Sequence, residues 1–551
     1  MTDSLQNETD VKTLLDHQRM MEGERMLYEP LWRELDERVD PQAAGGFDKR
    51  TPGGDRGNGN FDATATTGLD NYTAAIAGLT IPTGQTWASL TTPDKDLNKL
   101  PEVQRWLEHA NDRLFACRYA PGAGFEVQAT ADIRQGGKYG TAPLWVDEVV
   151  GRGLFYRSIH MSEAWIDLDF TGRVDTFHRK YELTARQAAQ KFGRDALSDK
   201  MLCCLTDDNP AKQYEKFEFL HAVRPNGDYE YGAPAHLGMP DMGWTIAVDE
   251  KALIRKLGYH SFPVPTSRTI VTPGATYGRS PAMKVIGTIR VLQEIAKTML
   301  RAAHKSVDPA LAFFDDGNIS RLATKPGGFN PNLVDEMGNL LVHAIPGGGD
   351  LSWGLKVQEE ERQVVRDAFL ERIFQLLFDP TDRMTATEVL ERAQKEGLLV
   401  GPYRATQETE KLAPMTTREL DILMRARQID PMPPVMREAG VRQPVAEYQN
   451  GLARMARAEE ASGFMRLVEI TAQVSGFDPG AADHINFDRA VPGVAEVLSV
   501  RPSWLNSPDE VAAKRQQREQ AQAMQSLTES APAMAGAALD LAKANDVAAA
   551  A

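Results

Sequence analysis

The segment from Val357 to Gln428 constrains the fold most strongly, because its pattern predicts two helices joined by a sharp break. In its first part, apolar residues recur at every fourth position and so lie on one face of a helix. These residues are Val365, Phe369, Ile373 and Leu377. Asp379-Pro380 ends the pattern, because proline lacks an amide proton and disfavours a helical residue before it. From periodicity alone, the segment is a helical hairpin in a large protein rich in helices.

The second helix of this hairpin is expected to begin at Thr385, because Thr385 and Glu388 have the spacing of a capping box. We expect it to continue to Gln428, with interruptions at Gly401-Pro402 and at Pro414.

Another long helix is predicted from Ser280 to about His304, because Pro281 occupies the first helical position, where proline is favoured. Three basic residues share a face away from its apolar stripe: Arg290, Lys297 and Arg301. They form either a solvated face or a basic stripe that faces DNA or an acidic helix. Residues 310–356 follow as short, irregular segments, which predict a small β-rich excursion between two helices.

The first 140 residues predict mainly helices, and the next 90 predict strands. Helices are expected at 11–40 with an interruption near Tyr28–Trp32, at 61–81, at Pro101–Tyr119 and at Phe125–Tyr139, with a short strand at Trp87–Leu90 and an exposed loop at 41–60. From Gly140 to about Tyr231 the apolar period falls to two residues, which is typical of antiparallel strands. The fold class is therefore α+β, predominantly α. After Gln428, a helical region is expected from Pro444 to Val474, and the segment after Asp509 predicts a polar helix that needs neighbours or frays.

Composition indicates a globular protein of several domains, with 551 residues, 42% hydrophobic and 25% charged. The net charge of −15 argues against a protein that wraps tightly around DNA, but it is compatible with a wall that DNA slides past. No apolar run approaches the roughly eighteen residues of a membrane helix, so we expect no membrane association and assembly in the cytoplasm. Three cysteines are too few for a disulfide scaffold, and we expect all of them to be packed thiols: Cys117, Cys203 and Cys204.

No catalytic or metal-binding motif is present in the sequence. It contains no Gly-x-Ser-x-Gly, no His-Glu-x-x-His, no phosphate-binding Gly-Lys-Ser/Thr loop and no spaced Cys/His set. His160 and His178 lie in strand patterns and are expected to be ordinary packed or surface residues. The pairs Asp167/Asp169 and Asp315/Asp316 are expected to be solvated. We therefore expect no catalytic residue, no metal and no cofactor, although an enzyme with an unrecognised site stays open as an alternative.

Three groups of short motifs occur in a fixed order along the chain. They are Phe61-Asp62-Ala63-Thr64-Ala65 with Thr86-Trp87-Ala88-Ser89-Leu90, then Tyr277-Gly278-Arg279-Ser280-Pro281-Ala282-Met283 with Asp308-Pro309, and then Met384-Thr385-Ala386-Thr387-Glu388-Val389. Across about residues 10–505, this order and spacing resemble portal proteins, the head-to-tail connecting proteins of short-tailed bacteriophages.

The resemblance implies a ring of twelve subunits at one vertex of a virion capsid, with a central channel for DNA. It divides the chain into a wing at 1–277, a first stem helix at 278–305, a clip at 306–356, a second stem helix at 357–378, a tunnel loop at 379–384, a long wing helix at 385–430, and a crown with a tail at 431–551. Double-stranded DNA would pass through this channel, and the protein would not recognise its base sequence. The implied protein partners are the major capsid protein, the terminase large subunit, and tail adaptor and nozzle proteins.

The same resemblance implies roles for particular residues. The tunnel loop facing DNA would be Asp379, Pro380, Thr381, Asp382 and Arg383. Charges on the stem that face the channel or a neighbouring subunit would be Arg290, Lys297, Arg301, Glu360 and Glu361. The clip would dock its partners through Phe313, Phe314, Lys325 and Asn330. The alternative function is a structural adaptor or scaffold of a virion without a channel.

Overall fold

A computed structural model describes most of the chain. The described residues are 2–42, 46–47, 57, 59–149, 151–313, 323, 325, 327–330, 333–334, 337–345, 351–372, 403, 405–448, 463–473, 485–497, 506 and 510–521. The chain forms two compact units, Met1–Ala456 and Arg457–Ala551. In the first unit helices and antiparallel strands are mixed, so the fold is α+β as expected.

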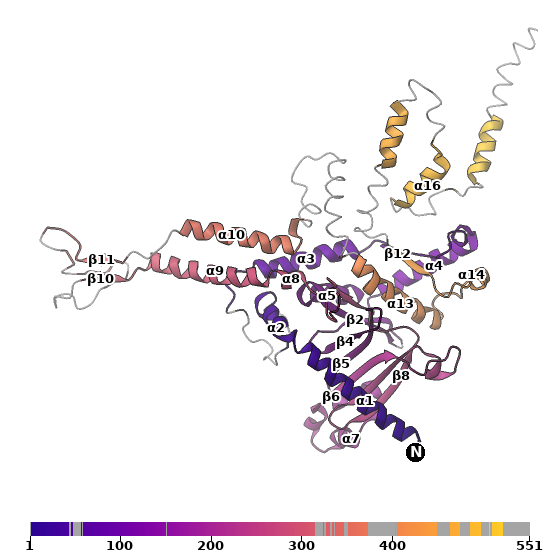
Figure 1. Cartoon of the computed structure of the whole chain (residues 1–551), viewed down its shortest axis with the longest axis horizontal. Helices are drawn as coiled ribbons and strands as arrows, with labels where there is room; N and C mark the ends of the chain where they lie inside the picture. The colour runs from indigo at the N-terminus through magenta and orange to yellow at the C-terminus, as the bar shows by residue number, and fades with distance from the viewer. Residues whose placement is uncertain are drawn as a thin grey trace, which may run out of the picture. The chain divides into compact units, whose positions relative to one another are not determined.

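A five-stranded antiparallel sheet forms one part of the first unit, in the order β4-β5-β6-β7-β8 (Figure 1). Its strands are β4 (Ala164–Leu168), β5 (Val174–Thr184), β6 (Lys216–Pro225), β7 (Asp241–Ala247) and β8 (Ala252–Tyr259). One face packs against the N-terminal helix α1 (Thr2–Arg25), where Leu14 meets Leu220 and Trp244. Helices α6 (Ala185–Phe192) and α7 (Asp199–Thr206) cover part of the opposite face.

The second sheet has three strands in the order β3-β2-β9, and a layer of helices packs next to it. Its strands are β2 (Thr141–Val149), β3 (Gly153–Ser158) and β9 (Thr266–Arg268), and the helices are α2 (Glu29–Arg38), α3 (Thr64–Thr80), α4 (Pro101–Arg118) and α5 (Phe125–Tyr139). The predicted helices at Pro101–Tyr119 and Phe125–Tyr139 are confirmed. The expected interruption near Tyr28 is also confirmed, because α1 ends at Arg25 and Pro30 lies in the first turn of α2.

The segment after Gln428 returns to this layer. Helices α13 (Ala413–Arg425) and α14 (Pro434–Glu438) precede strand β12 (Val445–Tyr448), which pairs with β1 (Ala88–Thr91). The predicted strand at Trp87–Leu90 is thus confirmed with a shift of one residue. The prediction of helix from Pro444 is wrong at its start, because the backbone of Val445–Tyr448 hydrogen-bonds to β1 instead of to itself. Short 3-10 helices in the described residues include Leu97–Lys99, Arg194–Ala196, Pro210–Tyr214 and Ala235–Gly238.

One other expectation, on the cysteines, is wrong. Cys203 is exposed, whereas Cys204 is buried and Cys117 is half-buried, so the three thiols are not all packed.

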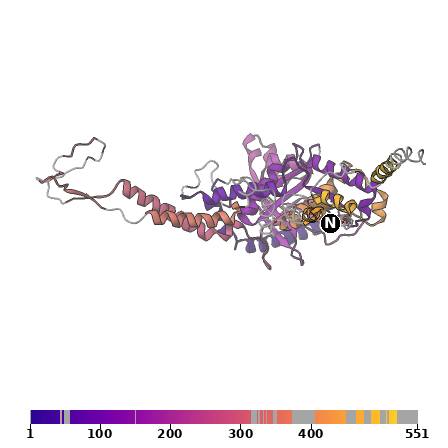
Figure 2. The same ribbon diagram turned by 90° about the horizontal axis from the view of Figure 1, so that it is seen from above.

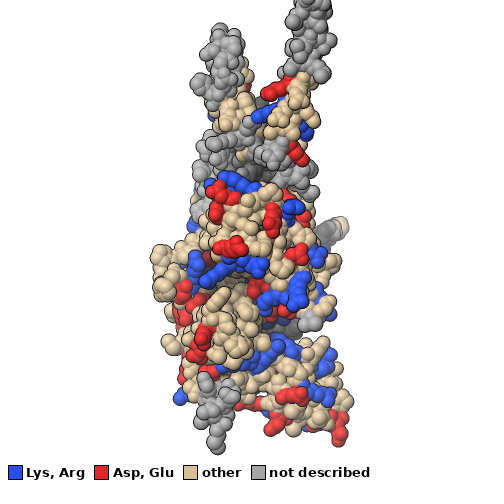
Figure 3. All heavy atoms as spheres, turned by 90° about the vertical axis from the view of Figure 1, so that its right-hand side faces the viewer, with Lys and Arg blue, Asp and Glu red and all other residues tan. Residues whose placement is uncertain are grey.

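The second unit contains described helices at 463–473, at α16 (Phe487–Val497) and at 510–521. Within the described residues of the whole chain, no helix is long and apolar enough to span a bilayer. The same residues contain no group of three side chains suited to hold a metal ion. On the face drawn in Figure 3, acidic and basic side chains are interspersed.

Candidate functional site

Two long helices lie side by side and lead away from the sheets to a β-hairpin (Figures 1 and 2). They are α9 (Ile286–Val307), preceded by the single turn α8 (Pro281–Lys284), and α10 (Leu351–Ala368). Close approach is possible because α10 has a glycine, Gly354, where a Cβ atom would overlap the sulfur of Met299 on α9. The first predicted helix is confirmed, with a break at Val285.

The second predicted helix is displaced toward the N-terminus. It begins at Leu351 instead of at Val357, so residues 351–356 belong to the helix and not to the β-rich excursion. It is interrupted after Ala368, where Leu370 adopts a φ of 61°, which the helix does not allow, and residues 371–372 are helical again. The predicted end at Phe378 lies outside the described residues. Val365 and Phe369 are buried as the periodicity predicts, whereas Ile373 and Leu377 lie outside the described residues.

Asp62 ties both helices to the body of the protein. Its backbone N–H donates to Oε1 of Gln293 on α9 at 3.1 Å, and the amide of Gln293 donates back to the Asp62 carbonyl at 2.8 Å. The Asp62 carboxylate accepts from Gln358 at 3.2 Å and from Arg362 at 2.8 Å, both on α10. It also accepts from the N–H of Thr64, the first residue of α3, at 2.9 Å.

The charge of Asp62 is stabilised by these contacts. Burial by itself would raise the pKa of this carboxyl, but the hydrogen bonds from Thr64 and the Arg362 guanidinium outweigh burial and hold its pKa below the usual range. The motif containing Asp62 was recognised in the sequence, but its partners on the two helices were not. Only the Asp-x-Thr spacing before a helix indicated part of this role.

A close contact between Gly68 of α3 and Phe369 packs the end of α10 against α3. Gly68 on α3 faces the ring of Phe369, and a Cβ atom at Gly68 would lie 2.8 Å from that ring. Phe369 and Val365 are fully buried against α3, where Tyr72 also contacts Phe369. Glycine at position 68 of α3 therefore leaves room for the ring of Phe369, which directly follows α10.

The start of the first helix is held by a second backbone contact. Gly140 has a φ of 79°, and a Cβ atom there would lie 2.5 Å from the backbone of Gly278 and Arg279. The Ser280 hydroxyl accepts from the N–H of Met283 at 3.0 Å and donates to the carbonyl of Lys138 at 2.7 Å. The Tyr-Gly-Arg-Ser-Pro motif is thus explained by its contact with the end of α5, a partner that the sequence did not reveal.

The predicted stem charges have different surroundings. Arg290 pairs within the chain with Glu34 of α2, with its Nε 2.6 Å from the carboxylate. Lys297 lies 3.9 Å from Glu294 on its own helix. Within the described part of the chain, Arg301, Glu360 and Glu361 take part in no ion pair.

The predicted clip contains a short hairpin of β10 (Leu311–Phe313) and β11 (Val342–Ala344). Phe313 is 41% exposed, and Phe329 in the same region is 96% exposed. Lys325 is exposed, whereas the side chain of Asn330 bonds both the N–H and the carbonyl of Ala323 and so closes a loop. Phe314 lies outside the described residues.

Large apolar side chains are exposed along the helix pair as well. Trp353 is 69% exposed, and five further residues on α9 and α10 are also open to solvent: Val291, Leu300, Val307, Leu355 and Val364. Large apolar side chains left open to solvent along one helix pair indicate a candidate contact with another protein. Its partner is not supplied by the described part of this chain.

The tunnel-loop residues Asp379–Arg383 and the start of the long helix at Thr385 lie outside the described residues. The backbone is helical from residue 405 onward and passes through a π-helical segment, Gln407–Leu412, into α13. At Pro414, in the first turn of α13, the hydrogen-bond pattern changes but the helix does not break, unlike the predicted interruption. Lys411 on the π-helical segment is buried and bonds Asp132 at 2.7 Å and the carbonyl of Ala142 at 2.7 Å.

A second buried anchor follows on α13. Arg118 and Glu419 pair with both side chains fully buried, and the Tyr156 hydroxyl donates to the same carboxylate. The sequence gave no signal for these pairs, since Arg118, Asp132, Lys411 and Glu419 are far apart in the chain and stand in ordinary helical patterns.

Proteins of similar sequence come from bacteriophages. A family model described as bacteriophage head to tail connecting protein matches residues 11–505. A probable portal protein of Bordetella phage BPP-1 is 28% identical over 94% of this chain and 93% of its own length. The portal protein of Salmonella phage epsilon15 is 24% identical over 96% of this chain and 95% of its own length. The chain therefore belongs to the family of bacteriophage head-to-tail connecting proteins.

Proposed function

We propose that this portal protein forms a closed ring, of twelve subunits by resemblance, at one vertex of a phage head. Double-stranded DNA passes through its centre during packaging and ejection. The observation that carries the proposal is the exposed apolar surface of α9, α10 and the hairpin, together with the anchoring of these helices through Asp62. Neighbouring subunits would bury this surface.

A ring fixes the kind of contact between subunits. Each interface is heterologous, so that one face of a subunit meets a different face of the next. Arg301 is then free to pair with Glu360 or Glu361 of the neighbour, and Lys297 can join them. Each exposed pair contributes only about 0–1 kcal/mol, and burial of the apolar side chains supplies the larger part of the interface energy.

The parts of the chain take the roles that the resemblance implies. In this proposal α9 and α10 are the stem, residues 379–384 the tunnel loop, and the sheets the wing that contacts the major capsid protein. The hairpin with Phe313, Phe314, Lys325 and Asn330 is the clip, which docks the terminase large subunit and later the tail adaptor and nozzle. Residues 431–551 include the crown. A conduit of this kind needs no catalytic residue or cofactor.

Disulfide cross-linking tests the subunit contact. In α9 and α10 the pairing of Gly354 with Met299 places residue 360 beside the Gln293 region, well away from Arg301 of the same chain. A variant without the three native cysteines and with Arg301→Cys and Glu360→Cys should therefore form a ladder of covalent oligomers under oxidation. Each single-cysteine variant is the control and should give dimers at most. Monomers only, from a sample that forms rings, would contradict the proposed pairing.

A further inference from the structure

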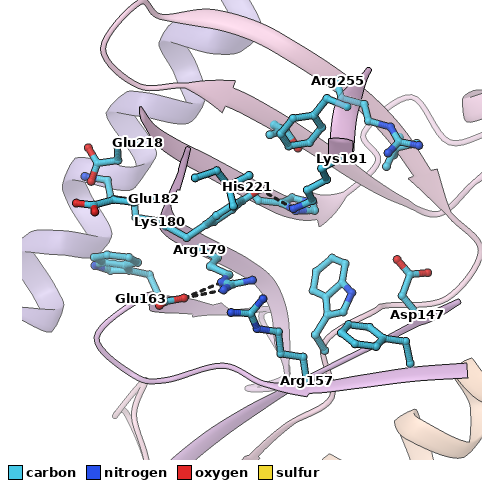
Figure 4. Close-up of a pocket in the computed structure, with 18 of the residues that line it drawn as sticks. Asp147, Arg157, Glu163, Arg179, Lys180, Glu182, Lys191, Glu218, His221 and Arg255 are labelled. Carbon is cyan, nitrogen blue, oxygen red and sulfur yellow. Dashed lines mark hydrogen bonds and ion pairs between the residues drawn. The ribbon is translucent and has the colours of Figure 1, made fainter. Parts of the chain in front are cut away.

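A charged cavity of about 1200 Å³ lies between the two sheets (Figure 4). The five-stranded sheet supplies one wall, and β2 and β3 of the three-stranded sheet supply part of another. Aromatic and aliphatic side chains such as Phe155, Leu183 and Leu257 share the lining with charged ones. The cavity is open to solvent along one side, and no feature of the proposed channel uses it.

The register of the sheet places a polar row across the middle of this wall. Arg179 on β5 pairs with His221 on β6, His221 with Thr245 on β7, and Thr245 with Arg255 on β8. The adjacent row on the same face is apolar, with Tyr181 opposite Phe219. Because a sheet face that looks inward normally continues its apolar pattern, a polar row with an arginine at each end points to a ligand rather than to packing.

Five cationic residues line this space, and one of them, Lys180, pairs with Glu22. The other four come from separate elements: Arg157 of β3, Arg179 of β5, Lys191 of α6 and Arg255 of β8 (Figure 4). Arg179 is bound by Glu163, with distances of 2.7 and 2.9 Å. In the part of the chain that the structure describes, no carboxylate lies within ion-pair distance of Arg157, Lys191 or Arg255.

The cations repel one another across the cavity. Partial desolvation, and then the charges of Arg179, Arg157 and Arg255, lower the pKa of Lys191 to about 8. Burial and the charge of Lys191 lower the pKa of His221 to about 3, so His221 stays neutral. Its Nε2 atom has no hydrogen-bond partner among the described residues. Lys191 Nζ donates to the Tyr181 hydroxyl at 2.9 Å, and an anion in the cavity would offset the repulsion that the neighbouring cations exert on this ammonium.

We propose that this cavity binds a carboxylate-rich segment of a partner protein. The cavity exceeds the roughly 300–1000 Å³ of an ordinary small-molecule site and is open, which suits a length of extended chain. Two carboxylate side chains can reach the four cations, while apolar side chains between them pack on Phe155 and Leu257.

A nucleic acid strand fits the same walls less well. It carries a charge on every phosphate, and the cavity also presents carboxylates, among them Glu148, Glu182 and Glu218. These would repel a continuous row of phosphates. A peptide with few, spaced carboxylates can place each of them against Lys191 or Arg255 and avoid these groups.

The test measures binding of labelled probes to the full-length protein by fluorescence anisotropy at low salt. The probe is a fluorescein-labelled dodecapeptide of alternating glutamate and alanine, and the comparison probes are its glutamine counterpart and a labelled dodecamer of thymidylate. We expect saturable binding of the glutamate peptide, at least tenfold weaker binding of the glutamine peptide, and weaker binding of the thymidylate strand.

Two double variants complete the test. Lys191→Gln with Arg255→Gln should weaken binding of the glutamate peptide at least tenfold. Lys95→Gln with Arg105→Gln removes the same charge from exposed positions outside the cavity and should leave binding within twofold. Thermal unfolding of each variant checks that the fold is kept. The proposal is overturned if the glutamate peptide does not bind, if both double variants bind it equally, or if the cavity variant loses only the thymidylate strand.

Discussion

The Asp62 carboxylate lies 2.8 Å from Nε of Arg362, which joins the segment before α3 directly to α10. The same residue holds Gln293 of α9 through its backbone, so one aspartate sets the position of both long helices relative to the body. A helix pair that carries exposed apolar side chains can meet a neighbouring subunit in a defined way only if its base is fixed. The Asp62 contacts therefore connect the local structure of the chain with its assembly.

Asp62→Asn should lower the free energy of unfolding of the first unit by about 1–3 kcal/mol, because Arg362 loses the nearer of its two charged partners and keeps only Glu359 at 3.5 Å, while Gln358 keeps a neutral partner. Asp112→Asn, at an exposed position on α4, is the control and should change stability by less than about 0.5 kcal/mol. Urea unfolding at pH 7 measures both. Equal effects of the two substitutions would show that Asp62 does not anchor the helices.

The contribution of Asp62 should depend on pH in a defined direction. Its pKa in the folded protein is below the ordinary value, so the folded state binds this proton less readily than the unfolded state. The stability it contributes is fully present above the ordinary aspartate pKa of about 4 and is lost as the pH falls below that value through the folded pKa. The difference in unfolding free energy between the wild type and Asp62→Asn should therefore shrink below about pH 4. A difference that grows on acidification would contradict this account.

Gly140→Ala should be severely destabilising. Its φ of 79° costs an alanine about 1–2 kcal/mol, and the new methyl group would meet the backbone of Gly278 and Arg279 at 2.5 Å, where neither side can yield. Gly151→Ala is a matched control, because Gly151 has a φ of 81° with nothing within 4 Å. We expect a modest fall in Tm for Gly151→Ala and a fall at least twice as large, or insoluble protein, for Gly140→Ala. Similar values of Tm would exclude the backbone contact as the reason for the glycine.

Lys411→Met should destabilise the protein by about 3–5 kcal/mol, because it leaves the buried Asp132 carboxylate without its cation. Burial already raises the pKa of Asp132 to about 6, even with Lys411 present. The double variant Lys411→Met with Asp132→Leu removes both charges and should recover most of the loss. A double variant less stable than Lys411→Met alone would mean that Asp132 has another role. Chemical denaturation of all three variants provides the comparison.

Arg383→Glu tests the proposed tunnel loop. If this residue lines the channel, reversal of its charge should leave rings intact and change the amount of DNA packaged or retained, because the wall would then repel the phosphates. Ring formation is checked by electron microscopy and packaged DNA by nuclease protection. Arg425→Glu, on the described helix α13, is a control that should package normally. Normal packaging by Arg383→Glu would remove this residue from the lining.

The sequence predicted those elements whose pattern is local. The helices Pro101–Arg118 and Phe125–Tyr139 carry apolar stripes at helical spacing, and the strands around Trp145 and Phe177 are rich in aromatic and β-branched residues. Strand β12 could not be predicted in this way, because Val445–Tyr448 is extended only through its pairing with β1, more than 350 positions away in the chain. The break in the helix after Ala368, where Leu370 has a positive φ, was also missed, because the apolar residues continue at helical spacing past it.

The site was predicted in outline but not in its contacts. The helix, excursion and helix order followed from proline positions and periodicity, and family resemblance supplied their roles. The pairing of Arg290 with Glu34, the Asp62 contacts and the Gly140–Gly278 approach depend on segments brought together by the fold. Exposure of Trp353 likewise cannot be read from an amphipathic pattern, because a tryptophan there would equally suit a core.

The most direct test of the central claim is electron cryomicroscopy of the assembled full-length protein. The account predicts a closed ring in which α9 and α10 of successive subunits surround an axial hole wide enough for a DNA duplex, with Trp353 buried between neighbours. A protein that stays monomeric under all assembly conditions, or a ring in which α9 and α10 lie on the outer rim, would contradict it.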